Sequence, residues 1–291
     1  MEFAKLRCIS FLNRFGSLPR ARRAFAGVAP EPMFGRPLFG ANMALDVSRS
    51  EVQQLLVAEG ERFVDERKLL RRLLGPGMTV VDVGANIGYY LLLFEQAVGS
   101  TGKVVCIEPS VENLPELRAN IEGNGFGNVV LHEVALGAED GEVRLRSGVN
   151  SGVVEGRAGG EYTVPLRRLD SLVDERVDLL KIDVEGYEGQ VLSGATALLE
   201  KYRPILFLEL HPHIVGRFGY SVRGILDGLT PHYRDITLYE KTELANRSLL
   251  TKIAVRYLGR DALSRIQNPD AYVEQYDRSQ VSHTYWAVCK P

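Results

Sequence analysis

Cysteine is scarce in this chain, and the few cysteines stand far apart. The 291 residues include three of them, Cys8, Cys106 and Cys289, and none belongs to a Cys-x-x-Cys pair. An odd number without close spacing excludes a disulfide framework and a zinc ribbon, because both need paired thiols at fixed separations. This use of cysteine is typical of a reducing compartment, so we expect a cytoplasmic protein.

The sequence also lacks an excess of one charge and a long hydrophobic run. Lys and Arg together number 35 and Asp and Glu 37, which gives a formal net charge of −2. Nucleic-acid-binding domains are usually basic, so this balance argues against a nucleic-acid partner. No stretch approaches the ~18 uninterrupted apolar residues of a membrane span. We therefore expect a globular protein with a full hydrophobic core.

The N-terminal part differs in composition from the rest. Residues 1–25 combine basic side chains with apolar ones at helical spacing. A signal peptide is not expected, because arginines interrupt the apolar residues and no small-residue cleavage site follows. Two interpretations stay open: a helix packed on its own domain, or a basic helix that touches an anionic membrane surface. Residues 27–42 are rich in Pro and Gly and predict a linker. We thus divide the chain into residues 1–42 and one domain, residues 43–291.

Within that domain, short apolar runs alternate with amphipathic segments. This alternation predicts an α/β fold with a mostly parallel sheet and helices on both faces. Residues 241–283 are too long for a hairpin and carry an apolar helical stripe, so we expect a helical insertion or lid there. The expected strands are 78–83, 103–108, 128–136, 142–146, 162–169, 177–184, 204–210, 235–240 and 284–290, and the expected helices are 87–98, 111–122, 188–200 and 222–229, with a strand and a long helix within 43–74.

A candidate cofactor-binding loop follows the expected strand 78–83. Open α/β sheets bind ligands beyond the carboxyl ends of their strands. Gly84 and Gly88 bracket a turn into a helix there, and Glu108 ends the next strand. Missing side chains let a ligand approach the backbone, and a carboxylate can accept both hydroxyls of a ribose. The pattern predicts a cofactor that contains a nucleoside.

The loop differs from the dinucleotide fingerprint. That fingerprint, Gly-x-Gly-x-x-Gly, needs glycine where Asn86 and Tyr89 stand. Asp82, just before the turn, suits an ammonium group better than a pyrophosphate. A nucleoside joined to an amino acid without phosphate is S-adenosyl-L-methionine, and we expect this cofactor. A nicotinamide-dependent oxidoreductase is the alternative.

Five short motifs resemble those of one family. The stretches VVDVGANIGYY, IEPSVEN, VALG, LLKIDVEGYE and LFLEL, within residues 45–211, resemble the FkbM-type family of S-adenosylmethionine-dependent methyltransferases. The resemblance implies a Rossmann-like sheet of seven strands, mostly parallel with an antiparallel last strand. It also implies O-methylation of sugars or of hydroxyls on natural products.

The same resemblance implies roles for single residues. A loop around Ser147–Ser151 loosely matches a polar segment that closes over the cofactor. The residues that it assigns to the cofactor are Asp82, Gly84, Asn86 and Gly88 for the methionine end, Glu108 and nearby Asn113 for the ribose, and Val134 and Ala135 for the adenine.

Candidate catalytic residues lie at the ends of two further strands. Asp183 and Glu185 alternate with one apolar residue, so we expect both on one side of the sheet together with Lys181. They could orient the acceptor and remove its proton, or form ion pairs with Lys181. His211 follows the next strand and could be a general base with a pKa near neutrality, or a histidine of an ordinary loop.

A metal is not expected, because methyl transfer from a sulfonium needs none in principle. Asp183, Glu209 and His211 could nevertheless converge on a hard metal ion. The sequence thus predicts a methyltransferase acting on a hydroxyl of a small-molecule or glycan acceptor. A non-catalytic cofactor-binding module is the other alternative, and no oligomeric state follows from the sequence.

Overall fold

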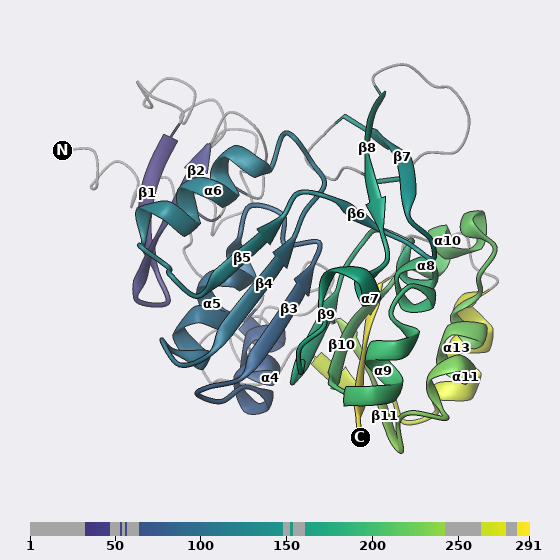
Figure 1. The fold of residues 1–291 in the computed structure, drawn as a ribbon. Coiled ribbons are helices and arrows are strands. Elements are labelled where there is room, and N and C mark those ends of the chain that lie inside the picture. Colours follow the sequence, from purple (N-terminus) through teal and green to yellow (C-terminus); the bar gives the residue numbers. More distant parts are fainter. Residues whose placement is uncertain are drawn as a thin grey trace, which may run out of the picture.

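The computed structural model describes residues 33–46, 53, 56, 64–147, 152–153, 161–241, 263–277 and 284–291. Within them, the largest sheet has eight strands in the order β12-β11-β13-β10-β9-β3-β4-β5 (Figure 1). Its strands are β3 (Thr79–Val83), β4 (Lys103–Ile107), β5 (Val129–His132), β9 (Leu179–Ile182), β10 (Ile205–Leu210), β11 (Asp235–Lys241), β12 (Leu263–Arg265) and β13 (Tyr285–Lys290).

The sheet is mostly parallel, as expected. Neighbours from β10 through β9, β3 and β4 to β5 pair in parallel, whereas β13 is antiparallel to both β10 and β11. The expectation of seven strands is wrong for the described residues, because the short strand β12 pairs antiparallel with β11 and adds an eighth strand at this edge. Its residues lie in the segment where we expected only helix, and three residues are too few to show a period-2 pattern.

Helices cover both faces of the sheet (Figure 1). Successive strand residues point to opposite faces, so Val80 belongs to one core and Val81 to the other. Helices α4 to α6 pack on the first face, and helices α8, α9, α11 and α13 on the second. The described helices are α4 (Val64–Leu73), α5 (Tyr89–Val98), α6 (Leu114–Gly123), α7 (Leu169–Leu172), α8 (Glu188–Ser193), α9 (Thr196–Tyr202), α10 (Pro212–Val215), the short 3₁₀ turn η1 (Gly216–Phe218), α11 (Val222–Leu229) and α13 (Pro269–Asp277).

A second, three-stranded sheet stands at the carboxyl edge of the first. It consists of β6 (Ala135–Leu136), β7 (Gly141–Arg146) and β8 (Glu161–Arg167), in the order β6-β8-β7. The expected strand 128–136 is therefore two strands, since β5 ends at His132 and β6 joins the other sheet. This second sheet borders the space above β4 and β5 (Figure 1).

A β-hairpin precedes the central sheet, where we expected a linker. Strands β1 (Met33–Leu38) and β2 (Ala41–Asp46) pair antiparallel. Phe39 and Gly40 between them both have positive φ, as a two-residue type I′ turn requires. Pro37 thus belongs to a strand and Gly40 to the turn, where we had expected a linker. The expected N-terminal helix, residues 1–25, and residues 242–262 of the expected insertion lie outside the described residues.

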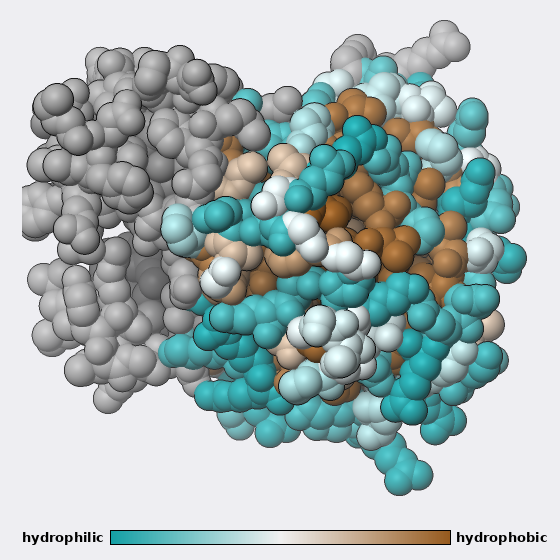
Figure 2. Space-filling view, turned by 60° about the vertical axis from the view of Figure 1, so that its left-hand side comes forward, coloured by the Kyte–Doolittle hydropathy of each residue, from teal (hydrophilic) through white to brown (hydrophobic). Residues whose placement is uncertain are grey.

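The surface of the described part is mixed. Figure 2 shows one face, on which hydrophobic residues gather in a region bordered by hydrophilic ones. Among the described residues, Val111 and Val130 are the exposed large hydrophobic ones. None of the described helices combines the length and apolar character needed to cross a membrane.

Candidate active site

A pocket opens at the carboxyl ends of β3, β4 and β9, where ligands of open α/β sheets bind. It encloses about 700 Å³ of empty space, part of it open to solvent. Eight of the eleven residues that the sequence predicted for the site line it: Gly84, Asn86, Glu108, Asn113, Val134, Ala135, Asp183 and Glu185. The other lining residues are Val83, Ile107, Pro109, Leu136, Leu145, Val153, Val184 and Tyr187.

Glu108 is fixed at the end of β4 by three hydrogen bonds. Its carboxylate accepts from the backbone N–H of Asn86 at 2.8 Å, from the backbone N–H of Ser110 at 2.9 Å and from the Asn113 amide at 3.3 Å. Burial raises the pKa of Glu108, although these hydrogen bonds oppose the rise. A carboxylate has about four acceptor positions, so roughly one is left for a ligand hydroxyl.

The two glycines of the loop serve the protein's own packing. Gly84 has φ +78°, and a Cβ there would lie 1.9 Å from the carbonyl oxygen of Asp183. A Cβ on Gly88 would lie 3.0 Å from Leu117 in α6. Gly84 lines the pocket and Gly88 does not, because Gly88 faces the helix packed behind the loop. We predicted that both glycines make room for a ligand. In this structure Gly88 instead makes room for the side chain of Leu117 in α6.

Asn86 completes the turn in an unusual conformation. It has φ +52°, which Asn tolerates better than most residues. Its side-chain oxygen accepts the backbone N–H of Ile87 at 2.8 Å, while its own N–H goes to Glu108. The backbone N–H groups of Asn86 and Ile87 therefore already have acceptors.

Asp82 does not reach the pocket. It is completely buried and accepts a hydrogen bond from Lys181 at 2.9 Å. The Lys181 ammonium also donates to the Gly84 carbonyl at 3.3 Å and lies 5.1 Å from the centre of the Tyr90 ring. The expectation that Asp82 faces a ligand ammonium is wrong in this structure. The reason is register: β3 and β9 pair with Asp82 beside Lys181, so the protein supplies the cation itself.

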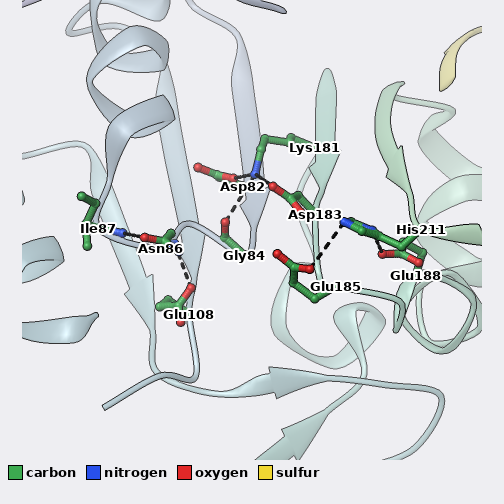
Figure 3. A network of polar contacts seen from close by, with 10 residues as sticks. All are labelled: Asp82, Gly84, Asn86, Ile87, Glu108, Lys181, Asp183, Glu185, Glu188 and His211. Atoms are coloured by element: carbon green, nitrogen blue, oxygen red, sulfur yellow. Dashed lines mark hydrogen bonds and ion pairs between the residues drawn. The ribbon is translucent and has the colours of Figure 1, made fainter. Parts of the chain in front are cut away.

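Asp183, Glu185 and His211 lie together at the pocket's other end (Figure 3). Strand β9 ends at Ile182, so the two acids stand in the turn that follows, where Glu185 has φ +52°. Glu185 therefore lies toward His211, at 3.7 Å, rather than beside Lys181. Asp183 lies 4.0 Å from the Lys181 ammonium.

A buried carboxylate behind His211 was not among the predicted site residues. Glu188, the first residue of α8, is fully buried and accepts a hydrogen bond from His211 Nδ1 at 2.8 Å. It also accepts the backbone N–H of Gly186 at 2.8 Å. An acid in the first turn of a helix has an ordinary role at the helix N-terminus. Only the tertiary fold brings it to a histidine 23 residues later in the chain.

These neighbours decide the protonation of His211. Burial lowers the pKa of His211, but the hydrogen bond to Glu188 and the negative charge of Glu188, Asp183 and Glu209 outweigh burial and raise it to about 10. A pKa raised in this way favours the protonated ring at neutral pH and disfavours His211 as a general base. Burial raises the pKa of Glu185, which makes its carboxylate a better proton acceptor.

Comparisons with known proteins find one matching family and several similar proteins. Residues 82–238 match the methyltransferase FkbM domain. The AMB antimetabolite synthetase AmbE of Pseudomonas aeruginosa is 26% identical over 229 residues, which cover 63% of this chain and 11% of that protein. Methyltransferase 1 of Beauveria bassiana is 27% identical over 143 residues, covering 40% of this chain and 57% of that protein.

The chain thus spans about a tenth of the length of one relative and just over half of the other. The crystal structure of methyltransferase FkbM from Methylobacillus flagellatus aligns with a TM-score of 0.40 and 16% identity, over 64% of this chain and 48% of that one. The family match covers more than half of the residues. It includes the turn 84–88, Glu108 after β4, and Asp183 and Glu185 after β9. The chain therefore belongs to the FkbM methyltransferase family.

Proposed function

We propose that this protein is an S-adenosylmethionine-dependent methyltransferase that methylates a hydroxyl oxygen of a sugar, a glycolipid or another natural product. One observation carries the proposal. A single pocket has Glu108 at one end and the Asp183 and Glu185 carboxylates at the other. Such a reaction needs one group of residues that binds the nucleoside of the cofactor and another that accepts the proton of the hydroxyl. Glu108 is suited to the first task, and the two carboxylates to the second.

The residues present fit the cofactor. Glu108 keeps about one acceptor position for a ribose hydroxyl, because three of about four are in use. Ile107, Ala135 and Leu136 offer apolar surface to a flat base. Asp183 and Glu185 bring negative charge to the end where a positive sulfonium would lie.

When bound, S-adenosylmethionine supplies a methyl group already activated by the positive charge on its sulfur. The protein then has two tasks, which are to align the acceptor oxygen with that methyl group and to take up its proton. Asp183 and Glu185 line the pocket and are carboxylates, so they are suited to bind the hydroxyl and accept the proton. His211 lies behind Glu185 and, with a pKa of about 10, contributes positive charge rather than a base.

The oxidoreductase alternative is less well supported. A pyrophosphate needs free N–H groups and no side chains at the start of the helix. Here Glu108 and the Asn86 side chain already accept the N–H groups of Asn86 and Ile87, just before the helix. A non-catalytic module would retain the cofactor without turnover on any acceptor.

Calorimetry tests the cofactor. We expect binding of S-adenosylmethionine and S-adenosylhomocysteine and no binding of NAD. Glu108→Gln should weaken S-adenosylhomocysteine binding by about 1.5–3 kcal/mol, the usual worth of a hydrogen bond to a charged group. Glu139→Gln, at an exposed acid outside the pocket, is the matched control and should bind normally. Tight NAD binding without any response to S-adenosylhomocysteine would refute the proposal.

The acceptor is identified by comparison of metabolites. Mass spectrometry of cells with and without the gene should reveal one compound that gains a single methyl group. The position of that methyl group on oxygen or nitrogen then checks the O-methylation part.

A further inference from the structure

The acids at the end of β9 and the histidine after β10 form a compact set of possible ligands. Asp183, Glu185 and His211 each offer one ligand atom, and these atoms lie within 4.8 Å of one another. Ligands bound about 2.0–2.2 Å from a metal ion lie roughly 3–4.3 Å apart, for tetrahedral through octahedral arrangements. Small side-chain rotations would therefore close the three around an ion.

His211 is oriented as metal-binding histidines are. Its Nδ1 donates to Glu188 Oε1 at 2.8 Å, and this pair is buried. The bond fixes the ring so that Nε2 points toward Glu185 (Figure 3). A carboxylate on the far nitrogen is the usual support of a histidine ligand.

The contact of Nε2 is too long for a hydrogen bond. Nε2 lies 3.7 Å from Glu185 Oε2, although the His211 residue is only 3% exposed. A ring nitrogen that donated an ordinary hydrogen bond to this carboxylate would lie about 2.8 Å from it. The gap leaves Nε2 aimed at the cluster without a partner at bonding distance.

Carboxylates outnumber cationic groups around this cluster. The Lys181 ammonium is engaged with Asp82 at 2.9 Å and stands 4.0 Å from Asp183. Three carboxylates, those of Asp183, Glu185 and Glu188, surround the single imidazole. A divalent cation would balance this charge.

We propose that Asp183, Glu185 and His211 Nε2 bind a divalent transition-metal ion of the Mn²⁺ or Zn²⁺ class. Two carboxylates and one imidazole suit such ions. Binding releases any proton that Nε2 carries, because a histidine ligand is neutral. Asp183 and Glu185 line the pocket, so the remaining coordination positions face the acceptor end.

The site would select a class of acceptor. An ion with adjacent open positions chelates two neighbouring oxygens, as in a vicinal diol of a sugar. It would also ease the loss of the hydroxyl proton, which the second oxygen of either carboxylate could take. This consequence rests on the proposed function, whereas ion binding itself rests on the geometry.

Titration of the metal-depleted full chain with MnCl₂ tests the site, followed by calorimetry and by the electron spin resonance of Mn²⁺. We expect one equivalent to bind, with Zn²⁺ tighter and Mg²⁺ weaker. Glu185→Gln is the sharpest variant, because its side chain is 39% exposed and the replacement keeps its size, so we expect the fold to stay intact. It should weaken Mn²⁺ binding at least tenfold. Glu188→Gln should weaken it by about 10–100-fold through the lost support of His211.

Glu139→Gln is the control and should bind Mn²⁺ as the natural chain does, since this acid is exposed and outside the cluster. The metal site is overturned if the natural chain shows no saturable Mn²⁺ binding, or if Glu185→Gln and Asp183→Asn bind as tightly as it does. S-adenosylhomocysteine is titrated into the same samples. Its binding without Mn²⁺ binding contradicts the metal site alone, and Mn²⁺ binding without it supports the metal site and contradicts the proposed function.

Discussion

Lys181 is a buried cation whose partners are all inside the protein. It is 1% exposed and pairs with Asp82, which is completely buried. One oxygen of Asp82 accepts from Lys181, and the other has no hydrogen-bond partner. Since the pair sits between β3 and β9, directly behind the turn at Gly84, it links the two strands that carry the cofactor loop and the acidic turn.

Replacement of this cation should therefore destabilise the fold. We expect Lys181→Met to lower the free energy of unfolding by about 3–5 kcal/mol, because the Asp82 carboxylate is left buried without a counter-charge. The double variant Asp82→Asn with Lys181→Met should recover part of the loss. Chemical denaturation measures both. Arg118→Met removes an exposed ion pair with Glu133 and should change stability little; an equal loss there would contradict the argument.

The rate of methyl transfer should distinguish the two acids from the residues that we propose bind the cofactor. Asp183→Asn or Glu185→Gln should lower the rate about 10²–10⁴-fold, the usual contribution of a group that takes a proton. The affinity for S-adenosylhomocysteine should stay nearly unchanged, since both replacements keep the shape. The assay uses an identified acceptor or co-expression with detection of the product. Normal turnover of both variants would mean that the acids are structural.

At the scale of elements, the β1-β2 hairpin is attached to α6 by two asparagines. Asn120 is fully buried; its oxygen accepts the backbone N–H of Ala44 at 2.6 Å, and its amide donates to the Ile87 carbonyl at 2.7 Å. Asn124, one turn later, makes a similar pair of hydrogen bonds with the Asn42 backbone in an exposed place. The buried asparagine thus connects the hairpin to the cofactor loop.

These two asparagines form a matched pair for mutation. Asn120→Ala should cost about 1–3 kcal/mol of stability, because buried backbone groups of β2 and of the loop lose their partners. Asn124→Ala should cost clearly less, because water replaces its hydrogen bonds. Urea unfolding of the two variants gives the comparison. Equal effects would show that burial does not control the strength of this attachment.

The turn between β1 and β2 provides a second contact between the hairpin and the helices of the central domain. Phe39 adopts φ +53°, is 6% exposed and packs edge-on against Tyr89 with ring centres 5.5 Å apart. The Arg67 guanidinium lies 5.1 Å from the centre of the Phe39 ring. A buried aromatic at the tip of the turn thus helps to hold this hairpin against the domain.

At the scale of the whole molecule, the central sheet buries two of the three cysteines. Cys106 and Cys289 are inaccessible, and burial raises the pKa of both thiols, that of Cys289 to about 12. Thiolates are the reactive form, so neither should react in the native state. With a thiol reagent we expect at most one fast equivalent from the native protein, from Cys8, and three after denaturation. Two or more fast equivalents would contradict the buried positions.

The chain's own pattern determined the alternating α/β order and the place of the pocket. Buried apolar runs such as that of β3, followed by a glycine turn and by Glu108 after β4, are local features that hold wherever the sheet forms. For the same reason Gly84, Glu108 and the acidic turn at Asp183 and Glu185 line the pocket at these strand ends. A residue that directly follows a parallel strand lies at the carboxyl edge of the sheet, where the pocket is, whatever the rest of the fold.

Only the tertiary structure decided which of these charges meet. Strand register pairs Asp82 with Lys181 and removes both from the pocket, although Lys181 stands two residues from Asp183. The positive φ of Glu185 turns that side chain toward His211, and α8 brings Glu188 to the ring's other nitrogen. Electrostatic energy depends on distances of a few ångströms, and contacts between segments far apart in the chain set those distances after folding.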